Sequence, residues 1–455
     1  MRPLTRRLTR VNAILVVALT LCTSCEQHAQ PAPGSAAQSP APASQSRKSG
    51  AIPVQIVFED GRYRLLRGGQ PYEIRGAGIG AGDIEAFAAH GGNSFRNWRD
   101  RDAEDGLRIL DRAQQHGLTV SMCIPIGRER QGFDYDDEEA VARQFEFARS
   151  EVLKYRDHPA LLAWIIGNEP DLNHTNPKVF DAINDISKMI HQLDGNHPTT
   201  TALASNPAKL AGILEDRAPD LDIISLQKYA DVVNVPRYIE EAGIERPYFI
   251  TEWGPAGHWE VAKTAWGAPI ELNSSEKAAL YLKHYETVMA PHRDRIIGSY
   301  VFLWGQKQER TPTWYGLFLA DGSETEAVDV MHYIWNGSWP ANRAPRIGSM
   351  LLDAKSSRED VILEAGAPYE ARVVAADPDG DRLEYRWEIM RESEAVQVGG
   401  DEEQIPDVVA AMVGAAKDGT VALAAPAEAG AYRLFVYVYD GRGHAGHANL
   451  PFLVK

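Results

Sequence analysis

The sequence predicts an α/β protein, a (β/α)8 TIM barrel followed by a C-terminal immunoglobulin-like β-sandwich. From residue 52 to about residue 340, short apolar runs alternate with amphipathic stretches. Eight such units fit a barrel of about 250 residues or more, and a doubly wound parallel sheet is the alternative. After residue 340 the pattern changes to alternating strands separated by Pro- and Gly-containing turns, which favours a sandwich.

The composition supports a chain that folds around a buried core. It has 455 residues, of which 44% are hydrophobic and 24% are charged, so wholesale disorder is excluded. The 63 acidic and 47 basic side chains give a net charge of -16. This acidic balance argues against a nucleic-acid partner, because such surfaces need clustered Lys and Arg.

Residues 1–25 resemble an export signal of the bacterial lipoprotein type. Four arginines precede the short apolar run 13–21, and Thr23-Ser24-Cys25 follows it. We expect export to the cell envelope, in the periplasm or at the outer membrane, with a lipid anchor on Cys25 as the only membrane contact. An ordinary secretory signal that is cut nearby is the alternative. Removing residues 1–24 deletes four Arg and no acid, giving -16 - 4 = -20.

The remaining chain divides into three predicted parts. Residues 26–50 are rich in Ala, Pro, Ser and Gln and predict a disordered linker. Residues 51–340 predict the (β/α)8 barrel, and residues 341–455 predict the immunoglobulin-like β-sandwich. The position of Cys123 in the apolar run 118–126 predicts a buried, inert thiol.

Eight apolar runs are the candidate barrel strands, at residues 74–79, 94–98, 118–126, 161–167, 199–204, 223–229, 248–253 and 298–304. One helix is clear from its period, because Val179, Ile183, Ile186, Ile190 and Leu193 share a face. Residues 63–74, with Gly68-Gly69 in the middle, predict a hairpin that closes the bottom of the barrel.

In the C-terminal part, residues 383–389 alternate apolar and charged side chains, as in a strand with one buried face. Residues 377–381 (DPDGD) fit either a β-turn or a Ca²⁺ loop, and the turn without metal is the prediction. No zinc-ligand spacing, phosphate-binding loop or Gly-x-Ser-x-Gly motif is present, so neither a metal nor a cofactor is expected.

Two glutamates stand at the ends of predicted strands. The run 161–167 is followed by Asn168-Glu169-Pro170, and Glu252 closes the run that begins at Tyr248. Active sites of such barrels are built at the carboxyl ends of the strands, so these two carboxyls should converge. A convergent pair suits glycoside hydrolysis, with one proton donor and one nucleophile or base. The alternative is that each is a solvated charge.

These segments resemble a known family. His158-Pro159, the strand that ends in Asn168-Glu169, Thr251-Glu252-Trp253-Gly254 and residues 62–76 are similar to the clan A retaining glycoside hydrolases. The resemblance is closest to the TIM-barrel domain of glycoside hydrolase family 2, and it covers about residues 58–340. Two departures are the lack of β-domains between the linker and the barrel, and Gln227-Lys228-Tyr229 in place of His-x-Tyr or Asn-x-Tyr.

The resemblance implies a role for several residues. Glu169 would be the general acid/base and Glu252 the nucleophile. Asn168 would bind the sugar 2-hydroxyl, and Tyr229 would hydrogen-bond the nucleophile. Arg96 would hold Glu252 ionised, and Trp304 would form the floor of the sugar subsite.

Aromatic side chains concentrate near these positions. Nine of the ten Trp fall within the barrel region, and flat aromatic faces suit sugar C–H surfaces. We therefore predict further sugar contacts from Trp98, Trp253 and Trp314, and from the polar Gln306. For Trp259 and Trp266, packing and sugar contact are equally good readings.

Together these features predict a retaining β-glycosidase that acts on a carbohydrate, a neutral β-glucan or oligosaccharide. A β-glucan transglycosylase with the same residues and a non-catalytic glycan-binding lipoprotein are the alternatives. A third reading starts from residues 76–81, which match the dinucleotide fingerprint G-x-G-x-x-A. That reading fails if the strand at residue 76 closes one barrel with the strands that carry the glutamates.

Overall fold

The computed structural model describes residues 50–98, 105–413 and 418–455. The predicted signal at residues 1–25, the anchor Cys25 and all but the last residue of the predicted linker lie outside them. Within the described ranges, no helix is long and apolar enough to cross a membrane.

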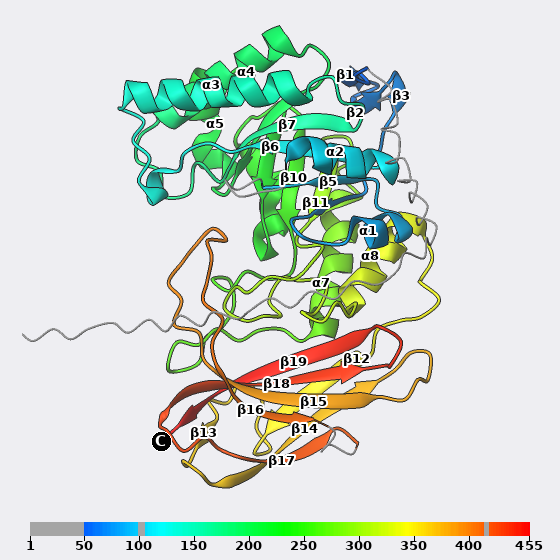
Figure 1. Cartoon of the computed structure of the whole chain (residues 1–455), viewed down its shortest axis with the longest axis vertical. Helices are drawn as coiled ribbons and strands as arrows, with labels where there is room; N and C mark the ends of the chain where they lie inside the picture. The colour runs from blue at the N-terminus through cyan, green and yellow to red at the C-terminus, as the bar shows by residue number, and fades with distance from the viewer. Residues whose placement is uncertain (1–49, 99–104, 414–417) are drawn as a thin grey trace, which may run out of the picture. The chain divides into compact units, whose positions relative to one another are not determined.

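Eight parallel strands close into a barrel, and helices alternate with them along the chain (Figure 1). The barrel confirms the predicted fold and excludes the doubly wound alternative. Its strands are β4 (Gly76–Gly78), β5 (Ser94–Arg96), β6 (Thr119–Ile124), β7 (Leu161–Asn168), β8 (Thr199–Leu203), β9 (Ile224–Gln227), β10 (Tyr248–Trp253) and β11 (Ile296–Val301). Its helices are α1 (Ile84–Ala89), α2 (Gly106–Gln115), α3 (Glu138–Tyr155), α4 (Lys178–Leu193), α5 (Pro207–Arg217), α6 (Val235–Glu241), α7 (Ser274–His284) and α8 (Glu326–Asn336).

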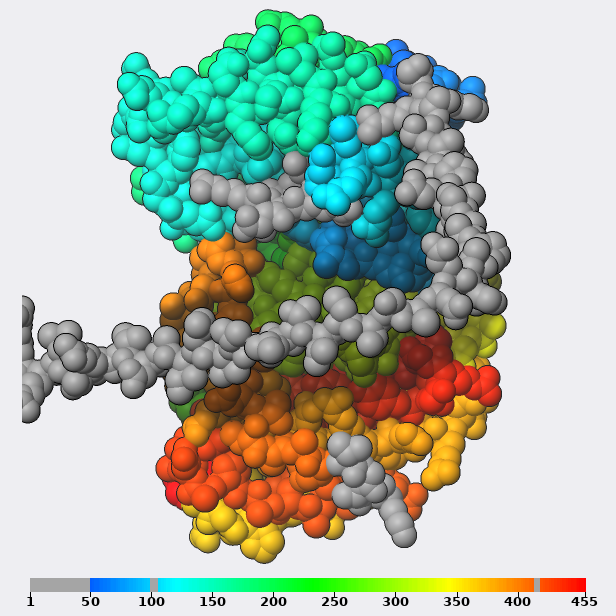
Figure 2. All heavy atoms as spheres, viewed as in Figure 1, coloured from blue at the N-terminus to red at the C-terminus, as the bar shows by residue number. Residues whose placement is uncertain are grey.

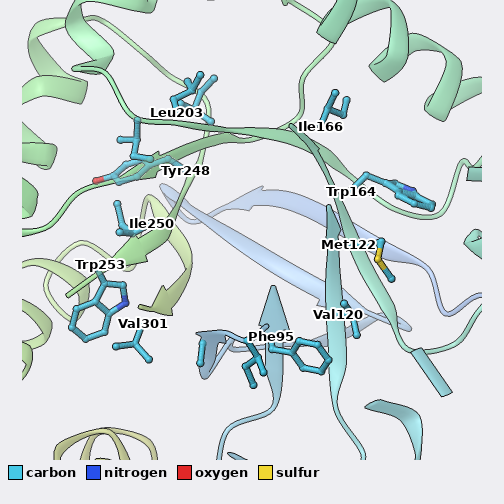
Figure 3. Packing of buried hydrophobic residues seen from close by; sticks show 14 of the residues in the cluster. Phe95, Val120, Met122, Trp164, Ile166, Leu203, Tyr248, Ile250, Trp253 and Val301 are labelled. Carbon is cyan, nitrogen blue, oxygen red and sulfur yellow. The ribbon is translucent and has the colours of Figure 1, made fainter. Parts of the chain in front are cut away.

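Side-chain periodicity explains where these elements pack. In α4, Val179, Ile183, Ile186 and Ile190 are buried, as their spacing predicts. Every second residue of the barrel strands faces the helices, and Figure 3 shows these side chains around the outside of the barrel. Apolar residues among the others, such as Leu162, Ala163 and Phe249, form a second cluster together with Val54 and Leu65 of the N-terminal strands.

A small antiparallel sheet closes the amino-terminal end of the barrel. It consists of β1 (Val54–Glu59), β2 (Arg62–Arg67) and β3 (Gln70–Pro71). The backbone N–H groups of Val54 and Tyr63 donate to the carbonyls of Asn196 and Asp294, both at 2.7 Å. These carbonyls precede β8 and β11, so the hairpin lies at the bottom of the barrel as predicted.

The C-terminal strands form two sheets around a separate apolar core, in which Trp387 is fully buried. One sheet has the order β12 (Arg346–Leu352), β14 (Pro368–Ala376), β17 (Thr420–Ala424). The other has the order β13 (Ile362–Leu363), β19 (Ala445–Val454), β18 (Gly430–Tyr439), β15 (Glu384–Arg391), β16 (Val408–Val413). All the pairs are antiparallel except β13 with β19.

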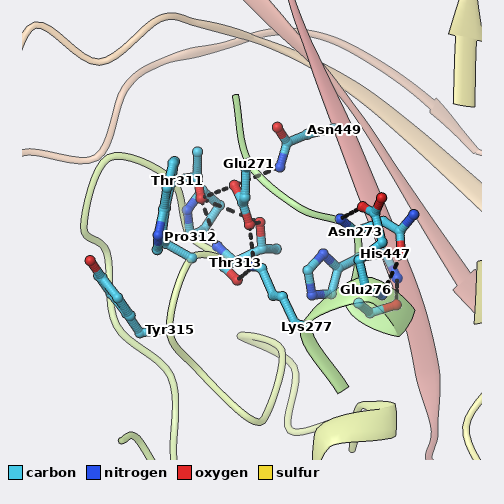
Figure 4. A network of polar contacts seen from close by, with 12 residues as sticks. Glu271, Asn273, Glu276, Lys277, Thr311, Pro312, Thr313, Tyr315, His447 and Asn449 are labelled. Carbon is cyan, nitrogen blue, oxygen red and sulfur yellow. Dashed lines mark hydrogen bonds and ion pairs between the residues drawn. The ribbon is translucent and has the colours of Figure 1, made fainter. Parts of the chain in front are cut away.

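A buried polar network joins this sandwich to the barrel (Figure 4). Glu271, between β10 and α7, pairs with Lys277 and accepts hydrogen bonds from Thr311 at 2.5 Å, Thr313 at 2.9 Å and Asn449 of β19 at 2.6 Å. Burial opposes ionisation of Glu271, but the Lys277 ammonium and these hydrogen bonds outweigh it and hold its pKa at about 2. The network therefore fixes the segment after β11 against the sandwich.

Candidate active site

A cleft of about 1460 Å³ opens at the carboxyl ends of the barrel strands, where sites on this fold are built. Both predicted glutamates line it. Glu169 is 9% exposed and Glu252 is 5% exposed, so neither is a solvated strand-end charge.

Irregular backbone aims the two carboxyls into the cleft. In β10 the register against β9 shifts between Ile250 and Glu252, so Glu252 falls opposite Gln227. In β7 the register against β8 shifts between Ile165 and Asn168, and Glu169 itself has a φ of 48°. Bulges of this kind re-aim side chains next to active sites, and a left-handed non-glycine residue is strained.

Four donors converge on the Glu252 carboxylate. Oε1 accepts hydrogen bonds from Arg96 Nη1 at 3.1 Å, Trp98 Nε1 at 2.9 Å and Gln227 Nε2 at 2.9 Å. Oε2 accepts one from Tyr229 Oη at 3.0 Å. Arg96 is completely buried and also forms an ion pair with Glu252. Such an arrangement stabilises a charged, oriented carboxylate.

Asn168 belongs to the same network. Its Oδ1 accepts hydrogen bonds from Arg96 Nη2 and Gln227 Nε2, both at 2.7 Å. Arg96 and Gln227 therefore bind Glu252 and Asn168 together. Since the amide oxygen is already used, the amide nitrogen of Asn168 is the group suited to a sugar hydroxyl.

Glu169 has the opposite environment. Among the described residues, no hydrogen-bond partner reaches its buried Oε2. Burial, together with the charge of Glu252, raises the pKa of Glu169 to about 8. Arg130 and Arg128 lie close by, but they donate to the backbone carbonyls of Glu169 and Asn168, both at 3.1 Å. The two carboxyls thus lie in contrasting environments, because four donors surround Glu252 and none among the described residues reaches Glu169 Oε2.

The structure corrects the expectation that Trp253 contacts sugar. Trp253 follows the bulge in β10, and alternation turns its ring outward among the residues that face the helices (Figure 3). The ring is 1% exposed and lies 5.7 Å from that of Tyr281 in α7. The position of a residue at a strand end did not decide which way it points.

Trp304 and Trp314 also differ from expectation. The Trp304 ring is fully buried against Phe87 and Phe318, and its Nε1 donates to Asp83 O at 3.0 Å. The Trp314 indole is 2% exposed and donates to Ala256 O. Trp304 borders the cleft, but its fully buried ring exposes no face to a sugar, and Trp314 does not line the cleft.

Phe302 takes the position that was expected for Trp304. It lines the cleft, and its ring lies 5.5 Å from that of Trp98 and 5.9 Å from that of Tyr229. Trp259 is 56% exposed at the cleft and packs edge-on against Tyr229. For Trp259, the arrangement favours sugar contact over packing.

Of the other predicted contacts, Trp98, Tyr229, Asn168 and Gln306 line the cleft, whereas Arg96 lies beneath it. The sequence interpretation missed Gln227 as part of the site. Its spacing of two from Tyr229 within the predicted strand 223–229 was the available signal, because alternate residues of a strand share a face, although β9 itself ends at Gln227. Arg128, Arg130 and residues 399–402 of the sandwich were also missed, since loops carry no such periodicity.

The dinucleotide reading of residues 76–81 is wrong. β4 pairs with β11 and β5 and closes the same barrel as β7 and β10. A Cβ on Gly78 would lie 2.5 Å from the Trp98 ring. The glycine there makes room for Trp98 rather than for a phosphate.

Residues 377–381 form the predicted turn, in which Asp377 Oδ1 accepts from the backbone N–H groups of Asp379 and Asp381. Asp377, Asp381 and Asp440 are the one acidic group among the described residues close enough to share a metal. Arg442 pairs with Asp381 Oδ1 at 2.9 Å, and Asp440 accepts several hydrogen bonds. Among the described residues, no hydrogen-bond partner reaches the buried Oδ2 atoms of Asp377 and Asp381.

Comparison with known proteins places the barrel. Residues 83–310, half of the chain, match the sequence family "Glycosyl hydrolases family 2, TIM barrel domain". No curated protein shows significant similarity. Similar solved structures include Bacteroides uniformis β-glucuronidase 2, at 13% identity and a TM-score of 0.49, over 88% of this chain and 48% of that one. The Dictyoglomus thermophilum β-D-glucuronidase (14%, 0.48) and the Eisenbergiella tayi GH2 β-galacturonidase (16%, 0.47) each cover 63% and 54%.

This chain spans about half the length of these solved proteins, and identities this low concern the fold alone. The family match covers the barrel, β7 and β10 included, and therefore the segments that carry both glutamates. On that match, the chain belongs to family 2 of the glycosyl hydrolases, and the matched part is the TIM barrel domain of that family.

Proposed function

We propose that this glycoside hydrolase cleaves β-glycosidic bonds with retention of configuration, with Glu169 as general acid/base and Glu252 as nucleophile. The observation that carries the proposal is the contrast between the two carboxyls. Glu252 accepts four hydrogen bonds as an ionised group would, whereas burial and the Glu252 charge raise the pKa of Glu169 to about 8.

In the first step, the Glu252 carboxylate attacks the anomeric carbon. The bond from that carbon to the leaving oxygen breaks as Glu169 donates its proton to that oxygen. Tyr229, Arg96 and Trp98 hold Glu252 in place for attack. The amide nitrogen of Asn168 donates to the sugar 2-hydroxyl, a contact that strengthens in the transition state.

In the second step, water replaces the leaving group. Glu169, now ionised, takes a proton from this water, whose oxygen attacks the anomeric carbon and releases Glu252. The product keeps the configuration of the substrate, and both carboxyls return to their starting protonation.

We further propose a neutral β-glucan or oligosaccharide as substrate. The exposed ring of Trp259 and the partly exposed ring of Trp98 offer flat faces to sugar C–H surfaces. The cations nearest Glu169 are engaged, because Arg128 and Arg130 both pair with Asp401. These two arginines are therefore not free to pair with the carboxylate of an acidic sugar.

The test is turnover of nitrophenyl β-glucoside, β-galactoside, β-mannoside and β-glucuronide and of β-linked oligosaccharides. The wild type should act on at least one, and the first product seen by proton NMR should be the β anomer. Glu252→Ala should lose at least 1,000-fold in kcat/KM. A first product in the α configuration, or an equally active Glu252→Ala, would overturn the proposal.

Two alternatives remain separate outcomes of this test. A transglycosylase would use the same residues and transfer the sugar from Glu252 to a second sugar, so oligosaccharides longer than the substrate would accumulate. A non-catalytic glycan-binding lipoprotein would bind glycans without turnover, and the paired glutamates argue against it.

We also propose that the protein is exported and anchored through Cys25, on the basis of the basic and apolar residues that precede it. Expression in a bacterial host should give a membrane-bound form with a diacylglyceryl group on Cys25, detected by mass spectrometry. Cys25→Ser should be released from the membrane. An unlipidated wild type that is cut elsewhere would instead identify an ordinary secretory signal.

A further inference from the structure

We propose that residues 397–403, supplied by the C-terminal sandwich, form the leaving-group side of the active site and select the leaving group. These residues belong to the connection between β15 and β16, and four of them line the cleft. Figures 1 and 2 show this connection in orange, rising from the sandwich to the barrel. The inference rests on the proposed function, because it takes Glu169 to be the proton donor.

The segment after β6 holds one side of the loop. Arg130 Nη2 donates to the Gly399 carbonyl at 3.3 Å, and Gln131 Nε2 donates to Asp401 Oδ1 at 2.8 Å. Asp401 also forms ion pairs with Arg130 at 3.6 Å and Arg128 at 3.7 Å. The same two arginines contact the backbone of Glu169 and Asn168, so the loop is tied to the strand end that carries the acid.

The segment after β11 holds the other side. Lys307 Nζ donates to the Gly400 carbonyl at 3.0 Å, and Arg310 Nη2 donates to the Gln397 carbonyl at 3.0 Å. Glu403 accepts from the Arg310 backbone N–H at 2.7 Å and is buried. β11 and β6 are separated by β4 and β5 in the barrel, so the loop spans part of its mouth.

Two glycines bring the loop against the acid. Gly399 and Gly400 have φ angles of 63° and 72°, which favour glycine. A Cβ on Gly399 would lie 2.7 Å from each of three atoms, Glu169 Oε2, Arg130 Nη2 and Leu172 Cδ2. The Gly399 backbone therefore packs against the Glu169 carboxyl with no room for a side chain.

This position identifies the side of the cleft. A general acid lies beside the oxygen that leaves, so whatever packs on Glu169 also borders the leaving group. The aromatic residues Trp98, Tyr229 and Phe302 gather around Glu252 instead, where the sugar being transferred would bind. Asp401 and Glu402 give the leaving-group side acceptors for hydroxyls, which favours a sugar over an apolar leaving group.

The test compares two substrates whose leaving oxygens both need protonation by Glu169 but whose leaving groups differ in size. Methyl β-D-glucoside and cellobiose both have poor leaving groups, whereas only cellobiose extends to the loop; the matching galactosides or glucuronides serve if the wild type prefers them. We expect Gly399→Ala and Asp401→Ala to lower kcat/KM for the disaccharide, relative to the methyl glycoside, about tenfold.

Gly366→Ala is the matched control. Gly366 also belongs to the sandwich and has a φ of 70°, but a Cβ there would meet nothing within 4 Å. An unchanged substrate ratio in both loop variants, or an equal change in Gly366→Ala, would overturn the inference. If Gly399→Ala does not fold, the ratio of kcat/KM values for the two substrates in Asp401→Ala serves as the test by itself. Failure of the proposed function would look different, since the wild type would then show no Glu252-dependent turnover of either substrate.

Discussion

Replacing Glu169 by Gln should stabilise the protein, and more so as the pH rises. Burial and the charge of Glu252 raise the pKa of Glu169 from 4.5 to about 8. Between these values the carboxyl is ionised in the unfolded chain but protonated in the folded one. The unfolded state therefore binds fewer protons, and the free energy of unfolding falls as the pH rises from 4.5 to 8.

The pKa difference sets the size of the effect. Each pKa unit corresponds to about 1.36 kcal/mol. From 4.5 to about 8, the wild type loses up to about 5 kcal/mol that Glu169→Gln does not lose. Below pH 4.5 the wild type and Glu169→Gln should differ little in stability. The Glu169 carboxyl is then neutral in both the folded and the unfolded state, and the glutamine amide has nearly the same shape as the protonated carboxyl.

Urea denaturation at pH 4.5, 6, 7.5 and 9, followed by tryptophan fluorescence, measures this difference. Glu85→Gln is the control, since Glu85 is an exposed residue of α1 and the change removes a carboxyl of the same kind from the surface. The gap between Glu169→Gln and the wild type should widen with pH, and that for Glu85→Gln should not. A gap that stays constant from pH 4.5 to pH 9 would refute the assigned electrostatics.

Three further predictions follow from buried or exposed positions. Arg96→Met removes the buried cation beside Glu252 and should lower kcat/KM at least 100-fold in steady-state assays; a smaller loss would show that the remaining donors suffice. Lys277→Met leaves the Glu271 carboxylate buried without its cation, and should cost about 3–5 kcal/mol at pH 7 in denaturant titrations. Because the pKa of Glu271 is held at about 2, the stability that this group contributes is present above pH 4.5 and declines as the pH falls toward 2, so the deficit of the variant should shrink in acid. Trp259→Ala should raise KM severalfold with little change in melting temperature, since its ring is exposed at the cleft; an unchanged KM would return Trp259 to a packing role.

The barrel was predictable because its signal is repeated. Each strand is a short apolar run followed by an amphipathic helix, and β10 ends at the predicted Trp253. Glu169 and Glu252 were predictable for a related reason, since strand ends of a parallel barrel share one face. Both glutamates follow or end apolar runs that the alternation of strands and helices along the sequence identifies as barrel strands.

The direction of individual side chains was not predictable. Bulges in β7 and β10 change which residues face inward, so Glu252 enters the cleft and Trp253 packs against α7. The register shift depends on the neighbouring strands, which a single sequence does not place. Phe302, which belongs to no motif, lines the cleft beside Trp98 and Tyr229.

The sequence by itself determined the barrel, the sandwich and the two carboxyls, because periodicity and strand ends are local features of the chain. Only the tertiary structure decided the protonation of Glu169, which depends on burial and on a charge 83 residues further along the chain (252 - 169 = 83). It also decided that Gly399 packs against that carboxyl. Such contacts join distant segments, and their energies depend on distance and solvent exclusion, which no local pattern encodes.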